Sequence, residues 1–131
     1  MVDILRKEVP YGFDETVKKV EEAMLSEGFG VQLTTGIHDM FKKKLGIDDY
    51  PKYTMVIGCN PQLAKRALET SLDMGLVFPC SFTVFEQDGK IKVGHVSIMK
   101  IGAEIGLADK EAMAPLIEDT GKAVQKVWNK I

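Results

Sequence analysis

The sequence CSFTVFEQDGKIKVGHVS, residues 80–97, decides the fold, because two apolar stretches flank the dipeptide Asp88-Gly89. This dipeptide is the strongest short signal for a β-hairpin with a two-residue turn, so strands are expected at residues 76–86 and 90–98. Such a turn also fixes the register of the two strands. The expected pairs are Gln87 with Lys90, Glu86 with Ile91, Val84 with Val93, Phe82 with His95, and Cys80 with Ser97. One face of the hairpin then carries Cys80, Phe82, Val84, Ile91, Val93 and His95.

Three more strands are expected before the hairpin. Residues 2–9 mix apolar and charged side chains and end at Pro10, as in an edge or first strand. Residues 29–35 alternate apolar and polar side chains, which predicts that the odd-numbered side chains are buried. Residues 53–59 are apolar almost throughout, which predicts a central strand buried on both faces.

Two helices are expected between these strands. The first extends from an N-cap at Asp14 to a stop at Gly28. The second is a short helix over residues 38–45, and its three consecutive lysines indicate a solvated face.

Two longer helices complete the expected set. Asn60 caps one of them, and Pro61 takes its first position, where the missing N–H costs nothing. The other begins near Asp109, and Pro115 predicts a kink in it or a later start. Residues 101–107 contain two glycines and are expected to form a loop.

The chain is therefore expected to form one domain over residues 1–131, in the order strand, helix, strand, short helix, strand, helix, hairpin, helix. Because a hairpin is antiparallel and the helices can cover one side of the sheet, the expected class is α+β. The expected architecture is a single, largely antiparallel sheet with helices packed on one face. At 131 residues and 45% hydrophobic content, such a chain needs no disulfide or metal to fold.

Composition narrows the classes of function. The chain has 17 basic and 19 acidic residues and a net charge of -2, so no basic surface is expected for nucleic acid or an anionic membrane. Neither a secretory signal nor an apolar run of about 18 residues is present, so no membrane association and a cytoplasmic location are expected. Two cysteines cannot form a disulfide scaffold.

Several motifs along the chain resemble one family. They are Phe13-Asp14-Glu15-Thr16-Val17, Glu27-Gly28-Phe29-Gly30-Val31, CNPQLAKRAL at 59–68, GLVFPC at 75–80, and Val84-Phe85-Glu86. Together they resemble the family called domain of unknown function 302 (DUF302), over nearly the whole chain. The resemblance implies a small α+β fold with an antiparallel sheet, a topology similar to that of TATA-box-binding proteins, and a homodimer, but no established activity. DNA binding does not follow, because fold does not determine function and this chain is not basic.

The candidate ligand-binding residues are Cys59, Asn60, Pro61, Cys80 and His95. Cys59 immediately precedes a helix N-terminus, whose partial positive charge stabilises a thiolate or binds an anion. A small buried side chain on a strand explains Cys59 equally well. His95 lies diagonal to Cys80 in the expected register, at roughly 7–8 Å between backbones, a gap that side chains or a ligand can span.

Other kinds of site are not indicated. The spacing of Cys59, Cys80 and His95 matches no zinc pattern, so no metal is expected. No cofactor is expected either, since the chain lacks a CxxC motif, a phosphate-binding glycine loop and a serine elbow.

Three hypotheses of function follow, and the sequence does not decide whether the protein is an enzyme. The first is a homodimeric cytoplasmic module that binds a small molecule or an anion in a pocket near Cys59, Cys80 and His95. The second is a thiol-based redox or sulfur-transfer protein, with Cys59 as nucleophile, Cys80 as resolving thiol and His95 as base. The third is a structural protein without a small-molecule site, which pairs through the exposed edge of residues 2–9.

Overall fold

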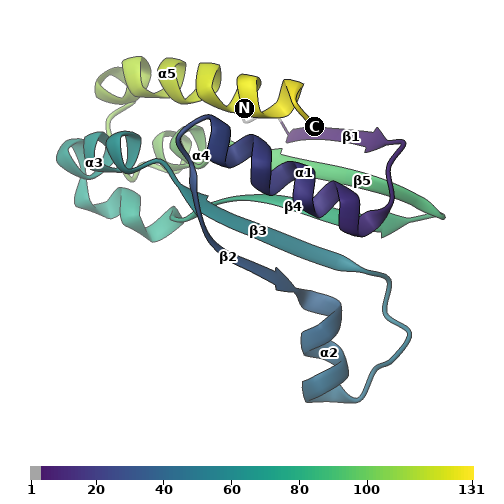
Figure 1. Ribbon diagram of the computed structural model, residues 1–131. Helices are drawn as coiled ribbons and strands as arrows, with labels where there is room; N and C mark the ends of the chain where they lie inside the picture. The colour runs from purple at the N-terminus through teal and green to yellow at the C-terminus, as the bar shows by residue number, and fades with distance from the viewer. Residues whose placement is uncertain (1–3) are drawn as a thin grey trace.

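The hairpin at Asp88-Gly89 organises the sheet of the computed structural model, which describes residues 4–131 (Figure 1). Both turn residues have positive φ, 54° for Asp88 and 72° for Gly89, the geometry that twists a hairpin correctly. The two strands are β4 (Cys80–Gln87) and β5 (Lys90–Val96). Four of the five expected pairs are confirmed: Gln87 with Lys90, Glu86 with Ile91, Val84 with Val93, and Phe82 with His95.

The fifth expected pair, Cys80 with Ser97, is wrong. Cys80 pairs with Gly58 of β3 (Tyr53–Cys59) on its other side and has no partner in β5 among the described residues. Ser97 lies beyond the end of β5, where its hydroxyl accepts a hydrogen bond of 3.3 Å from the backbone N–H of Lys100 and so caps a helix. The pairing of β4 with β5 therefore ends at Phe82 and His95, while Cys80 stays in the sheet through β3.

Over the described residues, the sheet has five antiparallel strands in the order β1-β5-β4-β3-β2, with β1 (Ile4–Val9) and β2 (Gly30–Gly36) at its edges. Val2 and Asp3 of the expected first strand lie outside the described residues. The helices are α1 (Phe13–Ser26), α2 (Ile37–Leu45), α3 (Pro61–Thr70), α4 (Ile98–Glu104) and α5 (Lys110–Asn129), with a 3₁₀ helix, η1 (Leu72–Val77), after α3. In Figure 1, α1 and α5 lie over the same face of the sheet, whereas α2 projects from its far end. The α+β class and the helix-covered face are confirmed.

Helices cover only one face of the strand β3, whereas the sequence predicted burial on both faces. Thr54, Val56 and Gly58 are buried beneath the helices, while the alternating side chains Met55 and Ile57 are only half-buried. The reason is that the sheet has one helical layer, so apolar residues on the second face remain partly exposed. The middle strand is β4, and β3 lies between β4 and β2.

The strand β2 also departs from simple alternation. Its register with β3 shifts between Val31 and Leu33, which leaves Gln32 as the extra residue of a bulge. A bulge moves the following side chains to the opposite face. Val31 therefore packs against the core while Leu33 is 53% exposed, and the expectation that all odd-numbered residues are buried fails after the bulge.

Three helix boundaries differ from expectation. The N-cap of α1 is Gly12 and not Asp14, because the buried Phe13 is already helical; Asp14 lies in the first turn, where the helix dipole favours a negative charge. Residues 76 and 77 belong to η1, so β4 begins only after Pro79, which has no N–H to donate to a ladder. Residues 98–104 form the helix α4, although a loop was expected over 101–107.

The last helix confirms its expected cap and its expected start near Asp109, and the later start that Pro115 had suggested does not occur. The carboxylate of Asp109 accepts a 2.9 Å hydrogen bond from the backbone N–H of Ala112, and α5 runs from Lys110 through Pro115 to Asn129. Pro115 is exposed, so its missing hydrogen bond falls on the solvent side.

Buried apolar side chains form two clusters. The larger lies between the sheet and helices α1 and α5, and includes Met24, Val56, Phe82 and Val127. The smaller lies between α3, η1, α4 and α5, and includes Met74, Met99, Met113 and Leu116. Helix α5 contributes to both clusters. Within residues 4–131, no helix is long and apolar enough to cross a membrane.

Candidate functional site

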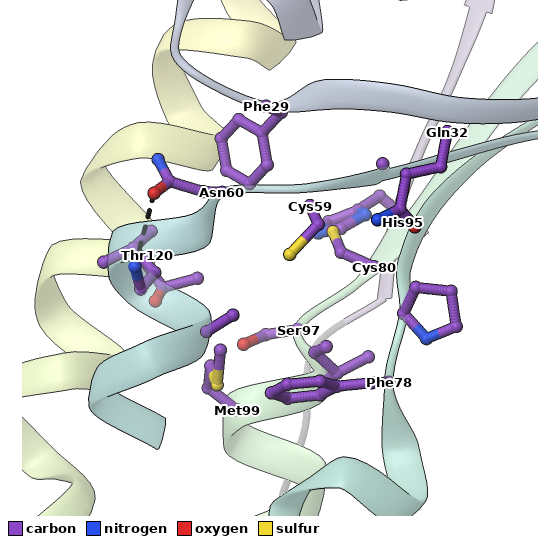
Figure 2. Close-up of a pocket in the computed structure, with 15 residues that line it drawn as sticks. Phe29, Gln32, Cys59, Asn60, Phe78, Cys80, His95, Ser97, Met99 and Thr120 are labelled. Carbon is purple, nitrogen blue, oxygen red and sulfur yellow. Dashed lines mark hydrogen bonds between the residues drawn. The ribbon is translucent and has the colours of Figure 1, made fainter. Parts of the chain in front are cut away.

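A cavity of about 280 Å³ lies where the two apolar clusters meet, between the ends of β3 and β4 and the helices α3, α4 and α5 (Figure 2). Phe29 and Cys80 on its wall pack with the larger cluster, Phe78 and Met99 with the smaller, and Leu63 with both. None of the 15 lining residues is a lysine, arginine, aspartate or glutamate. The cavity therefore suits an uncharged, largely apolar molecule.

His95 is held rigidly in the cavity wall. It is 6% exposed, and its ring stacks on Phe82 with 4.1 Å between ring centroids. Its Nδ1 lies 2.8 Å from the carbonyl oxygen of Ser81. Because a carbonyl oxygen can only accept, Nδ1 carries the proton and Nε2 presents a lone pair. Nε2 has no hydrogen-bond partner in the described part of the chain.

Burial lowers the pKa of His95, outweighing the hydrogen bond to Ser81, which raises it. The imidazole is therefore neutral at pH 7. A neutral ring with its Nδ1–H engaged can act only as an acceptor, a base or a metal ligand at Nε2.

Thr120 of α5 supplies a second buried polar atom. The side chain is 6% exposed, and its hydroxyl oxygen lacks a hydrogen-bond partner within residues 4–131. Two other helical threonines behave differently: Thr16 donates to the carbonyl of Gly12 at 2.8 Å, and Thr70 donates to that of Arg66 at 2.9 Å. Leaving a buried polar group unpaired costs about 1–3 kcal/mol, so two such groups among the residues that line one cavity require a reason.

The two cysteines are free thiols at the cavity wall. Cys59 ends β3, and Cys80 begins β4 opposite Gly58, so their positions are adjacent in the sheet. Burial, with a smaller effect from Cys59, raises the pKa of Cys80 to about 12. Cys80 therefore remains a protonated thiol at pH 7 and is a weak nucleophile. Figure 2 shows both sulfur atoms on the same side of the cavity as His95.

The N-terminus of α3 borders the cavity, but its donors are largely occupied. The side chain of Asn60 accepts a 3.3 Å hydrogen bond from the N–H of Leu63, and the N–H of Ala64 donates to the Asn60 carbonyl. Pro61 has no N–H, is exposed and does not line the cavity. Asn60 is thus both the expected cap and a cavity residue, whereas Pro61 only starts the helix.

Of the five candidate residues, Cys59, Asn60, Cys80 and His95 line one cavity and Pro61 does not. Among residues 4–131, no three His, Cys, Asp or Glu side chains lie close enough to hold a metal ion. The cysteines and His95 therefore share a wall without forming a metal-ligand set.

Sequence reasoning missed several residues of the wall, among them Phe29, Gln32 and Thr120. The place of Gln32 in the cavity wall could not be predicted from the sequence, because it results from the bulge in β2. Thr120 did leave a signal, since it is the one polar residue within the apolar stripe of the last helix. A polar side chain in such a stripe has to find a buried partner or face a cavity.

The fold and this cavity define a small α+β domain with a ligand-sized pocket at one end of an antiparallel sheet. The family model described as domain of unknown function DUF302 matches residues 5–131, and the chain belongs to this family. A crystal structure of an uncharacterized conserved DUF302 protein from Bacillus stearothermophilus is similar, with a TM-score of 0.85 and 25% sequence identity, over 97% of this chain and 96% of that chain. The search among curated proteins returned no match. The function of the family is unknown.

Proposed function

We propose that this protein binds a small, uncharged and largely apolar molecule in the cavity between the sheet and helices α3, α4 and α5. The observation that carries the proposal is that His95 and Thr120 both line this cavity, and that each has a buried polar atom, Nε2 and the hydroxyl oxygen, without a partner among the described residues. A bound ligand would satisfy them. Engineered apolar cavities of about 150 Å³ take up benzene, so a cavity of about 280 Å³ has room for a somewhat larger molecule.

Cavity filling tests this proposal. Ala64 is half-buried on the wall, so Ala64→Leu would fill part of the space, whereas Ala114→Leu places the same group on an exposed position of α5. A thermal-shift screen of small aromatic and aliphatic compounds should give ligands that stabilise wild type and Ala114→Leu. The same compounds should stabilise Ala64→Leu and His95→Ala less. Equal shifts in all four proteins would refute the pocket.

Thiol chemistry at Cys59 is a second candidate, favoured by the position of Cys59 and His95 on one cavity wall. In this reaction Cys59 would give its proton to Nε2 of His95. Its sulfur would then bond an electrophilic atom of the ligand, whose leaving group departs with the electron pair of the broken bond. Cys80 is a poor resolving thiol here, because its pKa is raised to about 12.

Alkylation by iodoacetamide separates the two thiols. A pKa raised from 9.0 to about 12 leaves about a thousandfold less thiolate at pH 8, so Cys80 in a Cys59→Ser variant should react far more slowly than a free thiol. Cys59 in a Cys80→Ser variant should react faster than Cys80. If both react only in denaturant, the thiol mechanism is excluded.

We also propose a homodimer in the cytoplasm. Strand β1 is a sheet edge, pairs with β5 alone among the described strands, and carries Ile4 at 66% exposure, so its free side is available to a second copy. The two adjacent free thiols suit a reducing compartment. Light scattering should report a dimer for wild type and a monomer for Ile4→Pro, with circular dichroism as the check on folding. An unchanged dimer would exclude this edge.

A further inference from the structure

We infer that the ligand is a neutral molecule with an apolar body and one hydrogen-bond donor, of the phenol or alcohol class, whose O–H donates to Nε2 of His95. This inference rests on the proposed function and narrows the chemistry of the same cavity.

The tautomer of His95 sets the direction of the hydrogen bond. The Ser81 carbonyl, 2.8 Å from Nδ1, holds the ring proton there, and the stack on Phe82 fixes the ring plane. Nε2 can therefore accept a hydrogen bond but cannot donate one without taking up a second proton. A ligand atom placed against it has to carry hydrogen, which selects O–H and N–H groups over ethers, carbonyls and carboxylates. Burial lowers the pKa of His95 and keeps the ring neutral at pH 7, so it also leaves Nε2 as a hydrogen-bond acceptor.

Thr120 lies across the cavity from His95, on α5 (Figure 2). A hydroxyl group both donates and accepts, so Thr120 accommodates either kind of polar group and does not discriminate between them. The choice between a donor and an acceptor is therefore made at His95.

An anionic ligand is disfavoured by the same geometry. Among residues 4–131, no lysine or arginine lines the cavity. Two of the three first-turn N–H groups of α3, those of Leu63 and Ala64, are engaged by Asn60. A carboxylate would face the lone pair of His95 Nε2 without a compensating charge, and burying an unpaired charge is costly. The wall of this cavity therefore favours a small neutral molecule over an anion.

Three probes of similar shape test the inference: 4-ethylphenol, 4-ethyltoluene and 4-ethylbenzoate. Each presents a different group, O–H, CH₃ or carboxylate, at the same ring position. Calorimetric titration of wild type should give about tenfold tighter binding of 4-ethylphenol than of 4-ethyltoluene, the size expected for one well-placed buried hydrogen bond. It should give the weakest binding for 4-ethylbenzoate.

Two variants locate the preference. In His95→Phe the ring and its stack remain but the acceptor is lost, so the tenfold preference for 4-ethylphenol should fall to about one. In Ala114→Leu, where the change lies on an exposed position of α5 outside the cavity lining, the preference should persist. In the unsubstituted protein, the ¹⁵N resonance of His95 Nε2 should shift on addition of 4-ethylphenol and not of 4-ethyltoluene, which keeps the test independent of whether His95→Phe folds.

The outcomes separate the two claims. Equal or tighter binding of 4-ethyltoluene in wild type, or a preference for 4-ethylphenol that survives in folded His95→Phe, would overturn the donor inference while the pocket stands. Binding of none of the three probes to wild type would overturn the proposed pocket and this inference with it.

Discussion

At the scale of single residues, Gly58 shows how closely the end of β3 is packed beside the cavity. A Cβ at this position would lie 2.5 Å from Cε of Met24 and 2.9 Å from the carbonyl oxygen of Gly30. The methionine end can move, but the backbone of β2 cannot move without disturbing the sheet. We expect Gly58→Ala to lower the free energy of unfolding by about 1–3 kcal/mol, the usual cost of overpacking, measured by urea denaturation.

Gly121 provides the control for this substitution. It lies in the middle of α5, is exposed, and an added Cβ would meet nothing within 4 Å. Alanine has the higher helix propensity, so Gly121→Ala should raise the free energy of unfolding by up to about 1 kcal/mol. A Gly58→Ala variant as stable as wild type would show that the contact of the added Cβ with the Gly30 carbonyl oxygen does not destabilise the fold.

His95 gives a residue-scale prediction on pH. Because burial lowers its pKa from the ordinary 6.5, the unfolded chain takes up a proton near pH 6.5 while the folded chain takes it up only at lower pH. The contribution of His95 to stability is therefore complete above pH 6.5 and is lost as the pH falls through the pKa of the folded state. Urea denaturation at pH 7.5 and pH 5 should show a larger loss for wild type than for His95→Phe. The same loss in both proteins would contradict the prediction.

At the scale of elements, Asn60 links the cap of α3 to the cavity. Its side chain accepts the hydrogen bond from Leu63 N–H, and loss of such a cap costs about 1 kcal/mol. Asn60→Ala should lose this amount in urea denaturation, and Asn60→Asp, which keeps the accepting oxygen, should lose much less. Asp109→Ala, at the cap of α5, should match Asn60→Ala in stability. If Asn60→Asp loses as much as Asn60→Ala, the cap is not the reason for asparagine at this position.

Element boundaries mark the limit of what the sequence could predict. The Asp88-Gly89 turn specified the hairpin register because a two-residue turn leaves no freedom in the pairing. That register placed His95 on the same face as Cys80, and both residues line the cavity. The bulge at Gln32 and the helix α4 depend on contacts with distant elements, which no local pattern encodes. The expected loop over 101–107 failed because Ala103 and Met99 pack into the smaller cluster, and this packing outweighs the helix cost of Gly102.

At the scale of the whole molecule, the cavity lies at the junction of two apolar clusters, and helix α5 joins them. Its first half supplies Met113 and Leu116 to the smaller cluster, and its second half supplies Val124 and Val127 to the larger. Thr120 lies between these pairs and faces the cavity. The one polar residue of the stripe thus lies where one cluster ends and the other begins, which is also where we propose the ligand site.

Because one helix belongs to both clusters, we expect the chain to unfold in a single transition. Leu116→Ala in the smaller cluster and Met24→Ala in the larger remove side chains that are 3% and 0% exposed, and each should cost about 2–5 kcal/mol. The single tryptophan, Trp128, packs against the larger cluster, so its fluorescence reports on that cluster alone, whereas far-ultraviolet circular dichroism reports on all helices.

If the clusters are coupled, Leu116→Ala should shift the fluorescence midpoint in urea as far as the dichroism midpoint. A fluorescence midpoint that stays at the wild-type value, while the dichroism curve separates into two steps, would mean that the smaller cluster unfolds independently. In that case a ligand bound at the junction should restore a single transition, because it contacts both clusters at once.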